Sequence, residues 1–549
     1  MAVIAPLFGS SLNSPFSLHL KSGKELTIRN ISLLARNGFN PSCLPATDGY
    51  DEHDSTAAGY FLSGALRANG YDTVLISHVD DQSMYVLSRL DIFAVCISTT
   101  MIVDRNQLCA IARELKAHLP GIPVLAGGPL VWKSYIANLS GELRHAVTDQ
   151  EDWQLFPAKY VELCIDGFIV SPHGVAQLME LLARFLKQAQ PQLSDIPNIS
   201  LPNASDGAYC FTDRVDERVD YNAEITRWDL LDKLPTRVPI RSSIGCPQKC
   251  LYCDFNKMHP GLFLRNKQSL LRELELLKRA IQGKRSPVTM LAFSDDNIFL
   301  NRSRVEEVCM VMIESGINKH WGGFIRSDQV TENNIDLVKS SGFYMGMTGV
   351  ESGDTRQIAR MKKGLSLSKA KKGIELLDDR GIPVLMTFLV GFPGECEETI
   401  ANTIGFINNV HQSSGLTSYQ LYPMHVAPLS ALSSKETRAK YGLEGLFSKW
   451  KHATMDSKKA CQLSYQMFRN ISRISYSYHF ESYGFNRQIP VADLRKLYDQ
   501  RKQITIDLVE NAHPLDIASR FNEFGQLIGA ASTYPPESFI QEIERPSLQ

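Results

Sequence analysis

Three cysteines lie close together near the middle of the chain, at Cys246, Cys250 and Cys253, with the spacing C-x3-C-x2-C. They stand in a loop that contains Gly245 and Pro247, directly after a predicted strand. Thiolates select zinc, copper or iron–sulfur clusters. A closed zinc site needs four ligands, and no fourth Cys or His follows within the next few residues. Three thiolates on a 4Fe–4S cluster leave one iron free for a further ligand, so the spacing predicts a cluster; zinc or coincidentally buried cysteines are the alternatives.

The composition narrows the class of protein. The chain has 549 residues and 11 cysteines, an odd number that argues against a disulfide framework. The chain has 58 Lys and Arg against 59 Asp and Glu, so it lacks the basic excess that is typical of proteins that bind nucleic acid. The N-terminus has no cationic stretch before its apolar residues, and the longest apolar run, 382–392, is too short for a membrane span. We therefore expect a cytoplasmic protein with neither a membrane nor a nucleic-acid partner.

Short apolar runs alternate with helical patterns in the first third of the chain. The predicted strands are 31–35, 73–76, 92–97, 123–126 and 167–170, and the predicted helices are 57–69, 105–118 and 174–188. This alternation predicts an α/β fold with a Rossmann-like, doubly wound domain over 31–190, preceded by an extension over 1–30. Ligands of such sheets bind beyond the carboxyl ends of the strands, here after Ile97, Ala126 and Val170. Residues 191–237 show no sustained period and are predicted to be a linker.

The alternation resumes at residue 238. Strands are predicted at 239–244, 288–293, 321–326, 344–350, 383–390 and 418–424, with helices between them. Repeated βα units predict a partial (β/α)6 barrel over 238–427, whose active site lies at the carboxyl ends of the strands. Residues 428–549 are predicted to form a mostly helical C-terminal domain. Its aromatic residues either form its core or reach the barrel mouth; they include Trp450, Tyr476, Tyr478, Phe480 and Tyr483.

A C-x3-C-x-aromatic-C loop after the first strand of a barrel resembles the radical S-adenosylmethionine (SAM) superfamily. The resemblance implies that Cys246, Cys250 and Cys253 bind a 4Fe–4S cluster, and that SAM chelates the fourth iron through its amino and carboxylate groups. It also implies that Tyr252 packs near the adenine. In this family an electron from the cluster cleaves SAM to a 5′-deoxyadenosyl radical, so the cofactors supply the difficult chemistry and the barrel supplies geometry.

Four later segments resemble strand ends of the same family, namely 293–296, 326–328, 349–354 and 390–395. Their matching sequences are FSDD, RSD, GVESGD and VGFPGE. The resemblance implies SAM contacts from Ser294, Asp295, Asp296, Arg326, Glu351, Ser352 and Gly391. Taken singly, the two aspartates are also compatible with a helix N-cap, and Arg326 and Glu351 with structural ion pairs.

A doubly wound domain ahead of the barrel resembles the cobalamin-binding class of radical SAM enzymes. The matching residues follow three predicted strands; they are Ser98, Thr99 and Thr100, then Gly127, Gly128 and Pro129, then Ser171. Small hydroxyl and glycine residues let a corrin ring and its nucleotide tail approach the backbone. The alternative is a Rossmann-like domain that binds another nucleotide or no ligand. No G-x-G-x-x-G follows the first strand, which disfavours a dinucleotide.

Two histidines depart from that pattern. Many cobalamin proteins carry D-x-H-x-x-G, whose histidine is the lower axial ligand of cobalt. Here Asp51 and His53 retain D-x-H, but Thr56 stands in place of the glycine. His53 is therefore either a cobalt ligand or a solvated loop histidine. His173 stands where related sequences often have glutamate, and packing is its default role.

The arrangement resembles natural-product methyltransferases, including the phosphinate P-methyltransferases and the thiopeptide tryptophan methyltransferase. The leading hypothesis is a methyltransferase that moves a methyl group from methylcobalamin to an unactivated carbon, or phosphorus, of a small-molecule or peptide precursor. An external one-electron reductant of flavodoxin or ferredoxin type would be its partner. The alternative is a rearrangement or ring-forming enzyme without methyl transfer. A methylthiotransferase would need a second cysteine triplet, and the ordered strand-end motifs argue against a non-enzymatic cluster protein.

Overall fold

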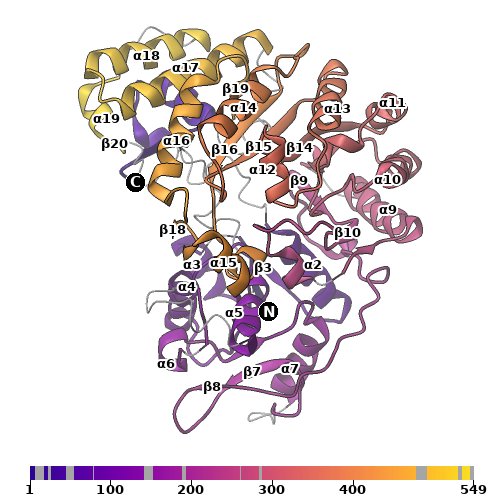
Figure 1. Ribbon diagram of the computed structural model, residues 1–549. Helices are drawn as coiled ribbons and strands as arrows, with labels where there is room; N and C mark the ends of the chain where they lie inside the picture. The colour runs from indigo at the N-terminus through magenta and orange to yellow at the C-terminus, as the bar shows by residue number, and fades with distance from the viewer. Residues whose placement is uncertain are drawn as a thin grey trace.

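Two seven-stranded sheets organise the computed structural model, one in the lower half of Figure 1 and one above it. The structure describes residues 1–5, 16, 18–22, 26–44, 55–77, 79–140, 153–156, 158–187, 193–259, 261–283, 287–477, 491–529 and 535–544. His53 and the aromatic residues Tyr478, Phe480 and Tyr483 lie outside the described residues.

The first sheet has the strand order β3-β1-β4-β5-β6-β7-β8. Its five parallel strands are β1 (Ala2–Ile4), β3 (Val74–Ile76), β4 (Val95–Ser98), β5 (Val124–Gly127) and β6 (Gly167–Ile169). Renumbered in chain order, these strands follow the doubly wound order 2-1-3-4-5. The helices beside it are α2 (Ala57–Ala68), α3 (Asp81–Leu87), α4 (Arg105–His118), α5 (Pro129–Ser140), α6 (Tyr160–Leu163) and α7 (Val175–Lys187).

Both faces of this sheet are buried, as a doubly wound fold requires. In β4, Val95 and Ile97 belong to one apolar cluster, whereas Cys96 between them belongs to another on the opposite face. Successive side chains of a strand point to opposite faces, so a strand covered on both sides is apolar throughout. The predicted Rossmann-like architecture is confirmed.

Two predictions for the N-terminal region are wrong. Residues 2–4, assigned to an extension, form the central strand β1. Residues 31–35, predicted as a strand, belong to helix α1 (Ile28–Arg36), which Thr27 caps by accepting a hydrogen bond from Asn30 N at 3.0 Å. The helix packs in an apolar cluster with C-terminal residues, and β2 (His19–Leu20) pairs with β20 (Ile543–Glu544). The indigo segment accordingly lies beside the yellow helices in Figure 1.

The predicted linker over 191–237 is also partly wrong. Its first half contains β7 (Ile199–Pro202) and β8 (Tyr209–Phe211), which extend the first sheet as antiparallel strands. The rest is irregular apart from a short 3₁₀ helix, η4 (Trp228–Leu230). Trp228 in η4 is fully buried and donates its indole N–H to Glu273 at 3.1 Å, so this end of the segment is fixed on the barrel.

The second sheet is the curved, parallel sheet of a partial barrel, with the order β19-β16-β15-β14-β13-β12-β9. Its strands are β9 (Arg237–Ile240), β12 (Met290–Phe293), β13 (His320–Phe324), β14 (Phe343–Glu351), β15 (Val384–Val390), β16 (Ser418–Pro423) and β19 (Ser475–Tyr476). Six of them match predicted strands, and β19 adds a seventh from the C-terminal region. Helices α9 (Lys267–Gly283), α10 (Arg302–Ser315), α11 (Ile335–Ser340), α12 (Thr355–Arg360), α13 (Leu367–Asp379) and α14 (Glu397–Asn408) separate the strands.

The C-terminal region is mostly helical, as predicted. Its helices are α15 (Lys435–Tyr441), α16 (Ser457–Asn470), α17 (Val491–Val509), α18 (Pro514–Leu527) and α19 (Glu537–Gln541). A hairpin of β17 (Glu444–Leu446) and β18 (Lys449–Lys451) precedes α16. Among the helices that the structure describes, none is both long and apolar enough to span a bilayer.

Candidate active site

The three clustered cysteines lie in a loop that leaves β9 and is closed by a small hairpin. Strand β10 (Ser243–Ile244) pairs antiparallel with β11 (Phe263–Leu264), so the cysteines lie between these strands in the chain. Gly245 has φ +84°, and a Cβ there would lie 2.1 Å from Gly261 O. Only glycine can therefore make this turn without moving the opposite backbone.

Asp295 fixes the base of the cysteine loop. Its carboxylate accepts hydrogen bonds from Ser242 N at 2.9 Å, Ser242 Oγ at 2.6 Å and Ser243 Oγ at 2.5 Å. Asp295 is only 2% exposed. The sequence predicted a SAM contact for Asp295, but the structure engages its carboxylate with the strand that leads to Cys246.

The cysteine thiols differ in exposure but influence one another. Cys250 is buried, whereas Cys246 and Cys253 are partly accessible. Burial raises the pKa of Cys253 to about 12, with contributions from Asp254 and the other two cysteines, and burial likewise raises the pKa of Cys246. Burial favours the neutral thiol, so the thiolates that bind iron require a compensating cation at this place.

The same loop is held from two sides by backbone hydrogen bonds. Leu251 N donates to Met361 O at 3.0 Å, and Leu432 N donates to Leu251 O at 2.9 Å. Within the described part of the chain, no three His, Cys, Asp or Glu side chains surround one point at the distances of a single metal ion. The three cysteines belong to one loop of eight residues, 246–253, and that short spacing is typical of the ligands of an iron–sulfur cluster.

Tyr252, Glu351 and Lys363 form a buried hydrogen-bonded group beside Cys250. Lys363 Nζ donates to Glu351 Oε1 at 2.8 Å and to the Tyr252 hydroxyl at 3.1 Å, and that hydroxyl donates to Glu351 Oε1 at 3.0 Å. Burial opposes the charge of Lys363, but the Glu351 carboxylate and the Cys250 sulfur outweigh it and raise the pKa of the ammonium. The structure thus brings two predicted SAM residues together, and adds a cation that the residue-by-residue prediction left out.

Arg326 supports this group rather than facing an open site. Its guanidinium binds both carboxylate oxygens of Asp328, at 3.1 and 2.8 Å, and donates to Lys363 O at 3.3 Å and Gly364 O at 2.7 Å. The structural ion pair considered for Arg326 is therefore present. It fixes the backbone that carries Lys363.

The end of β12 presents polar groups of different kinds. Ser294 Oγ donates to Ile240 O at 3.3 Å, and Asp296 faces Gly245. Burial raises the pKa of Asp296, while Arg241 acts in the opposite direction. Asn297 was not predicted; it is 9% exposed, and both its amide atoms are buried without a hydrogen-bond partner among the described residues. A buried amide without partners costs free energy, so this position fits a polar ligand.

Ser352 is turned away from this group. Its hydroxyl lies 3.2 Å from Thr403 Oγ1 and accepts a hydrogen bond from Asp354 N at 3.1 Å, and the side chain is fully buried. The hydroxyl is used in the turn before α12. Sequence reasoning could not detect this because the motif specifies the residue but not the direction of its side chain.

Gly391 opens the turn after β15. It has φ +97°, its N–H donates to the Glu395 carboxyl group, and its carbonyl is 2.8 Å from His452 Nε2. Burial raises the pKa of Glu395 to about 8. A Cβ on Gly391 would lie 2.7 Å from both Trp450 and Ala460, so glycine is required for both its conformation and its packing.

The predicted cobalamin residues do gather at the carboxyl edge of the first sheet. Thr99 Oγ1 donates to Gly127 O at 2.9 Å and accepts from Leu130 N at 3.2 Å. Ser98 Oγ and Thr100 Oγ1 are 3.0 Å apart. Gly128 has φ +108°, and a Cβ there would lie 3.0 Å from Thr99 Oγ1. Thr99 therefore packs tightly against residues 127 and 128; Pro129 follows as the first residue of α5.

Ser171 and His173 at the end of β6 belong to a second polar group. Ser171 Oγ donates to the Glu217 carboxylate and accepts from His173 N at 3.2 Å. His173 Nε2 is hydrogen-bonded to the Tyr221 hydroxyl, and Tyr221 contacts Phe263 of β11, with ring centroids 4.6 Å apart. Burial lowers the pKa of His173. His173 therefore connects the first sheet with the cysteine hairpin.

A second contact brings the two halves together at the cysteines. Helix α5 starts just after the end of β5, and helix α8 (Phe255–Met258) starts two residues after Cys253. Lys133 Nζ of α5 lies 2.9 Å from an Asp254 oxygen, and Trp132 Nε1 donates to Met258 O at 3.0 Å. The edge that carries Gly127 and Gly128 is thus attached to the loop that carries the cysteines.

His425 follows β16 and was missed by sequence reasoning. Its side chain is accessible, yet the surrounding protein, with a smaller contribution from Lys133, lowers its pKa. Its ring lies beside that of Phe447 in the β17–β18 hairpin, with centroids 5.2 Å apart. No local motif marked it.

Comparison with known proteins identifies the class to which this site belongs. Residues 240–407 match the family model described as the Radical SAM superfamily. This part of the chain is therefore a radical SAM domain, which implies a 4Fe–4S cluster and SAM as its cofactors. The predicted recognition and cofactor class of the barrel are confirmed.

Solved structures extend the likeness to the whole fold. The cobalamin-dependent radical SAM enzyme OxsB matches with a TM-score of 0.56 and 13% identity, over 89% of this chain and 75% of that chain. The radical SAM methyltransferase TsrM from Kitasatospora setae matches with a TM-score of 0.51 and 15% identity, over 68% of this chain and 71% of that chain. The chain has the fold of cobalamin-dependent radical SAM enzymes.

Curated relatives are distant and carry different activities. A protein named uncharacterized methyltransferase PH0819 from Pyrococcus horikoshii is 23% identical over 271 residues, 48% of this chain and 57% of the relative. The anaerobic magnesium-protoporphyrin IX monomethyl ester cyclase of Rubrivivax gelatinosus is 24% identical over 371 residues, 62% of this chain and 60% of the relative. The chain thus matches less than two thirds of the length of these relatives.

Proposed function

We propose that this chain is a cobalamin-dependent radical SAM methyltransferase that acts on a carbon or phosphorus atom of a small-molecule or peptide precursor. The observation that carries the proposal is the attachment of α5 to α8 through Lys133–Asp254 and Trp132–Met258. It sets the glycine edge of the first sheet against the cysteine loop, so cofactors bound at the two places would be neighbours. The names of TsrM and of PH0819 support methyl transfer.

The donor groups present fit the proposed cofactors. Cys246, Cys250 and Cys253 would hold the cluster, and the unpartnered amide of Asn297 and the Tyr252–Glu351–Lys363 group would contact SAM. Thr99, Gly127 and Gly128 would lie along the cobalamin at the carboxyl edge of the first sheet, where residues 127 and 128 carry no side chain of their own. When bound, the cluster supplies an electron from an external flavodoxin- or ferredoxin-type donor, SAM is its acceptor, and cobalamin carries the methyl group.

The protein's own contribution is to hold these groups and to exclude water. Lys363 donates to Glu351 and holds it in one position, so its carboxyl group is available for hydroxyl or ammonium groups of SAM. Asp295 and Arg304, which donates to Ser242 O at 2.7 Å, fix the strand that leads into the cysteine loop. His425, exposed just after the carboxyl end of β16, is a candidate contact for the methyl acceptor.

A ring-forming enzyme without methyl transfer is the second candidate. It is favoured by the likeness to the magnesium-protoporphyrin ester cyclase, which covers a larger part of this chain than the match to PH0819 does. Both candidates use the same barrel. They differ in whether cobalamin receives a methyl group from SAM.

The decisive experiment follows the methyl group without requiring the natural substrate. The full chain is reconstituted anaerobically with iron, sulfide and hydroxocobalamin, reduced with titanium(III) citrate, and given SAM with a deuterated methyl group. A methyltransferase is expected to place the deuterated methyl group on cobalamin, as read by mass spectrometry. Cobalamin that is retained but never labelled would contradict the methyltransferase and favour the second candidate. Cys250→Ala should lose iron and SAM cleavage. The control variant Cys210→Ser, at an exposed cysteine, should keep both.

A further inference from the structure

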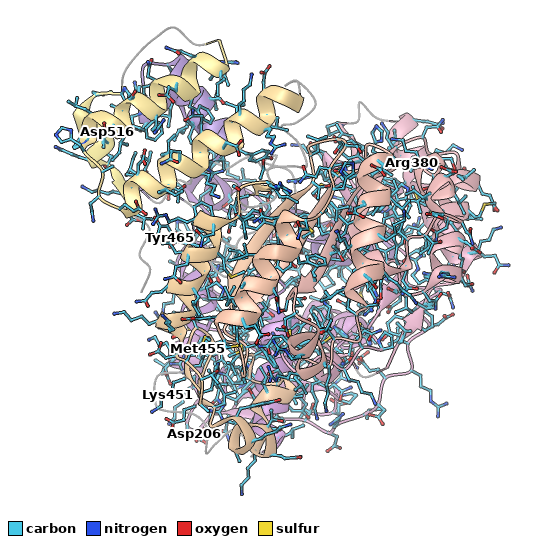
Figure 2. The ribbon with its side chains drawn as sticks, turned by 45° about the horizontal axis from the view of Figure 1, so that its top comes forward. Asp206, Arg380, Lys451, Met455, Tyr465 and Asp516 are labelled. Atoms are coloured by element: carbon cyan, nitrogen blue, oxygen red, sulfur yellow. The ribbon has the colours of Figure 1, made fainter. Side chains whose placement is uncertain are left out.

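The turn that follows β15 is held by a segment far away in the chain. Gly391 and Gly394 bound the turn, and both have positive φ, +97° and +87°. The Gly391 carbonyl is 2.8 Å from His452 Nε2, and Gly394 N donates to Thr454 Oγ1 at 3.3 Å. His452 and Thr454 lie in the loop between β18 and α16, whose flanking residues Lys451 and Met455 are labelled in Figure 2.

The hydrogen bonds of His452 define its tautomer. Nδ1 lies 3.3 Å from Thr454 N and 3.4 Å from Met455 N, and these backbone groups can only donate. Nδ1 is therefore the unprotonated nitrogen, and Nε2 carries the hydrogen that it donates to Gly391 O. Burial lowers the pKa of His452, which keeps the ring in this neutral form.

Trp450 completes the contact from the same hairpin. Its ring is stacked on His452, with centroids 5.0 Å apart and planes inclined by 5°. Its indole N–H donates to Met424 O at 2.6 Å, directly after β16. Trp450 carbons also occupy the space that a Cβ on Gly391 would need. His452 and Trp450 together determine where Gly391 lies.

The hairpin is connected to the cysteine loop as well. Leu251, Phe392, Leu432 and Trp450 belong to one apolar cluster, and Leu432 N donates to Leu251 O at 2.9 Å. Residues 424–455 therefore touch both the cluster loop and the turn after β15. This C-terminal segment therefore fixes the distance between the cysteine loop and the turn after β15, and a ligand that contacts both depends on that distance.

We propose that His452, stacked on Trp450, is a positioning residue that sets the Gly391 turn for SAM binding. This inference rests on the proposed use of SAM by the barrel. His452 acts through the Gly391 carbonyl and need not touch SAM itself. The C-terminal segment is accordingly part of the SAM site, although no cysteine or strand-end motif lies in it.

Two substitutions of His452 separate positioning from general stability. Asparagine keeps an acceptor near Nδ1 but is too short to reach Gly391, whereas glutamine can place an amide N–H near Nε2. We expect His452→Asn to raise the dissociation constant of SAM about three- to tenfold, the effect of losing one net hydrogen bond, and His452→Gln to restore most of the affinity. Equilibrium dialysis on the anaerobically reconstituted, cobalamin-loaded full chain gives the constant.

Kinetics provide the second readout. The KM for SAM in 5′-deoxyadenosine formation should rise in His452→Asn, while kcat at saturating SAM stays within about twofold of wild type. Iron content and cobalamin retention should be unchanged, and His118→Asn, an exposed histidine of α4, serves as the control. Equal SAM affinity in wild type and His452→Asn would overturn the inference, as would a parallel loss of iron and cobalamin in both His452 variants.

Two further outcomes are also decisive. If His452→Asn does not yield folded protein, Thr454→Val removes the contacts of Thr454 Oγ1 with both Gly394 N and His452 Nδ1. An unchanged KM for SAM in that variant overturns the inference. If the reconstituted wild type does not bind SAM, the proposed function fails at its first step, a result distinct from any difference between variants.

Discussion

Lys363 Nζ lies 2.8 Å from Glu351 Oε1, and the two side chains are only 15% and 13% exposed. Removing one partner of such a pair leaves a buried charge, which costs about 3–5 kcal/mol. We expect Lys363→Met to lower the thermal midpoint of the holoprotein, and Lys363→Met with Glu351→Gln to recover part of it. The surface pair Lys267–Glu314 is the matched control, because Lys267→Met should cost at most about 1 kcal/mol. If the losses of stability of the two single variants simply add up in the double variant, Lys363 and Glu351 are not energetically coupled.

Substitution of Asp295 tests whether this carboxylate fixes the cysteine loop or contacts SAM directly. In Asp295→Asn one oxygen becomes an NH₂ group that faces the donors of Ser242 and Ser243. We expect a loss of about 1–3 kcal/mol in stability and a lower iron content per chain. Thermal unfolding and iron analysis measure both. An unchanged midpoint together with a raised KM for SAM would instead restore the direct SAM contact that the sequence predicted.

The strands of the barrel were predictable because each is an apolar run bounded by turn residues. The predicted strands 383–390 and 418–424 agree with β15 and β16 to within one residue at each end. Strand β1 was missed because its three residues, Ala2–Ile4, are too few to show a period. Helix α1 carried a signal that could have corrected the strand prediction: Thr27 as N-cap, with Ile31, Leu34 and Ala35 at helical spacing.

The candidate site was predictable only where a residue type and its spacing carry the chemistry. The cysteine triplet met that condition. The direction of the Ser352 side chain and the engagement of Asp295 did not, because both depend on contacts with residues remote in sequence. His452 comes from a segment without a motif, and tertiary packing alone brings it to the Gly391 turn.

Gly128 tests the predicted cobalamin edge. In Gly128→Ala the φ of +108° becomes strained, and the new Cβ lies 3.0 Å from Thr99 Oγ1 and 3.1 Å from Thr99 N. We expect the variant to lose cobalamin during gel filtration, as read from the corrin absorbance, while iron content stays at the wild-type level. Gly121→Ala is the control, because its φ is +81° but nothing lies within 4 Å of the added Cβ. Equal corrin retention in both variants would argue against cobalamin at this edge.

Glu395 predicts a pH dependence of stability. Burial raises its pKa from 4.5 to about 8 in the folded chain, and Gly391 N donates to its carboxyl group. A raised pKa means that the folded state prefers the protonated acid. The stabilisation is therefore complete below pH 4.5, declines as pH rises, and is lost above about pH 8.

Glu395→Gln keeps an acceptor for Gly391 N but cannot ionise. We therefore expect the thermal midpoint of wild type to fall more steeply than that of Glu395→Gln between pH 6 and pH 9, since ionisation of one such group costs up to about 1.4 kcal/mol of stability for each pH unit. Glu397→Gln, at an exposed carboxylate in the first turn of α14, is the control and should follow wild type. Parallel midpoint curves for wild type and Glu395→Gln would show that the carboxyl group is already ionised in the folded protein at neutral pH.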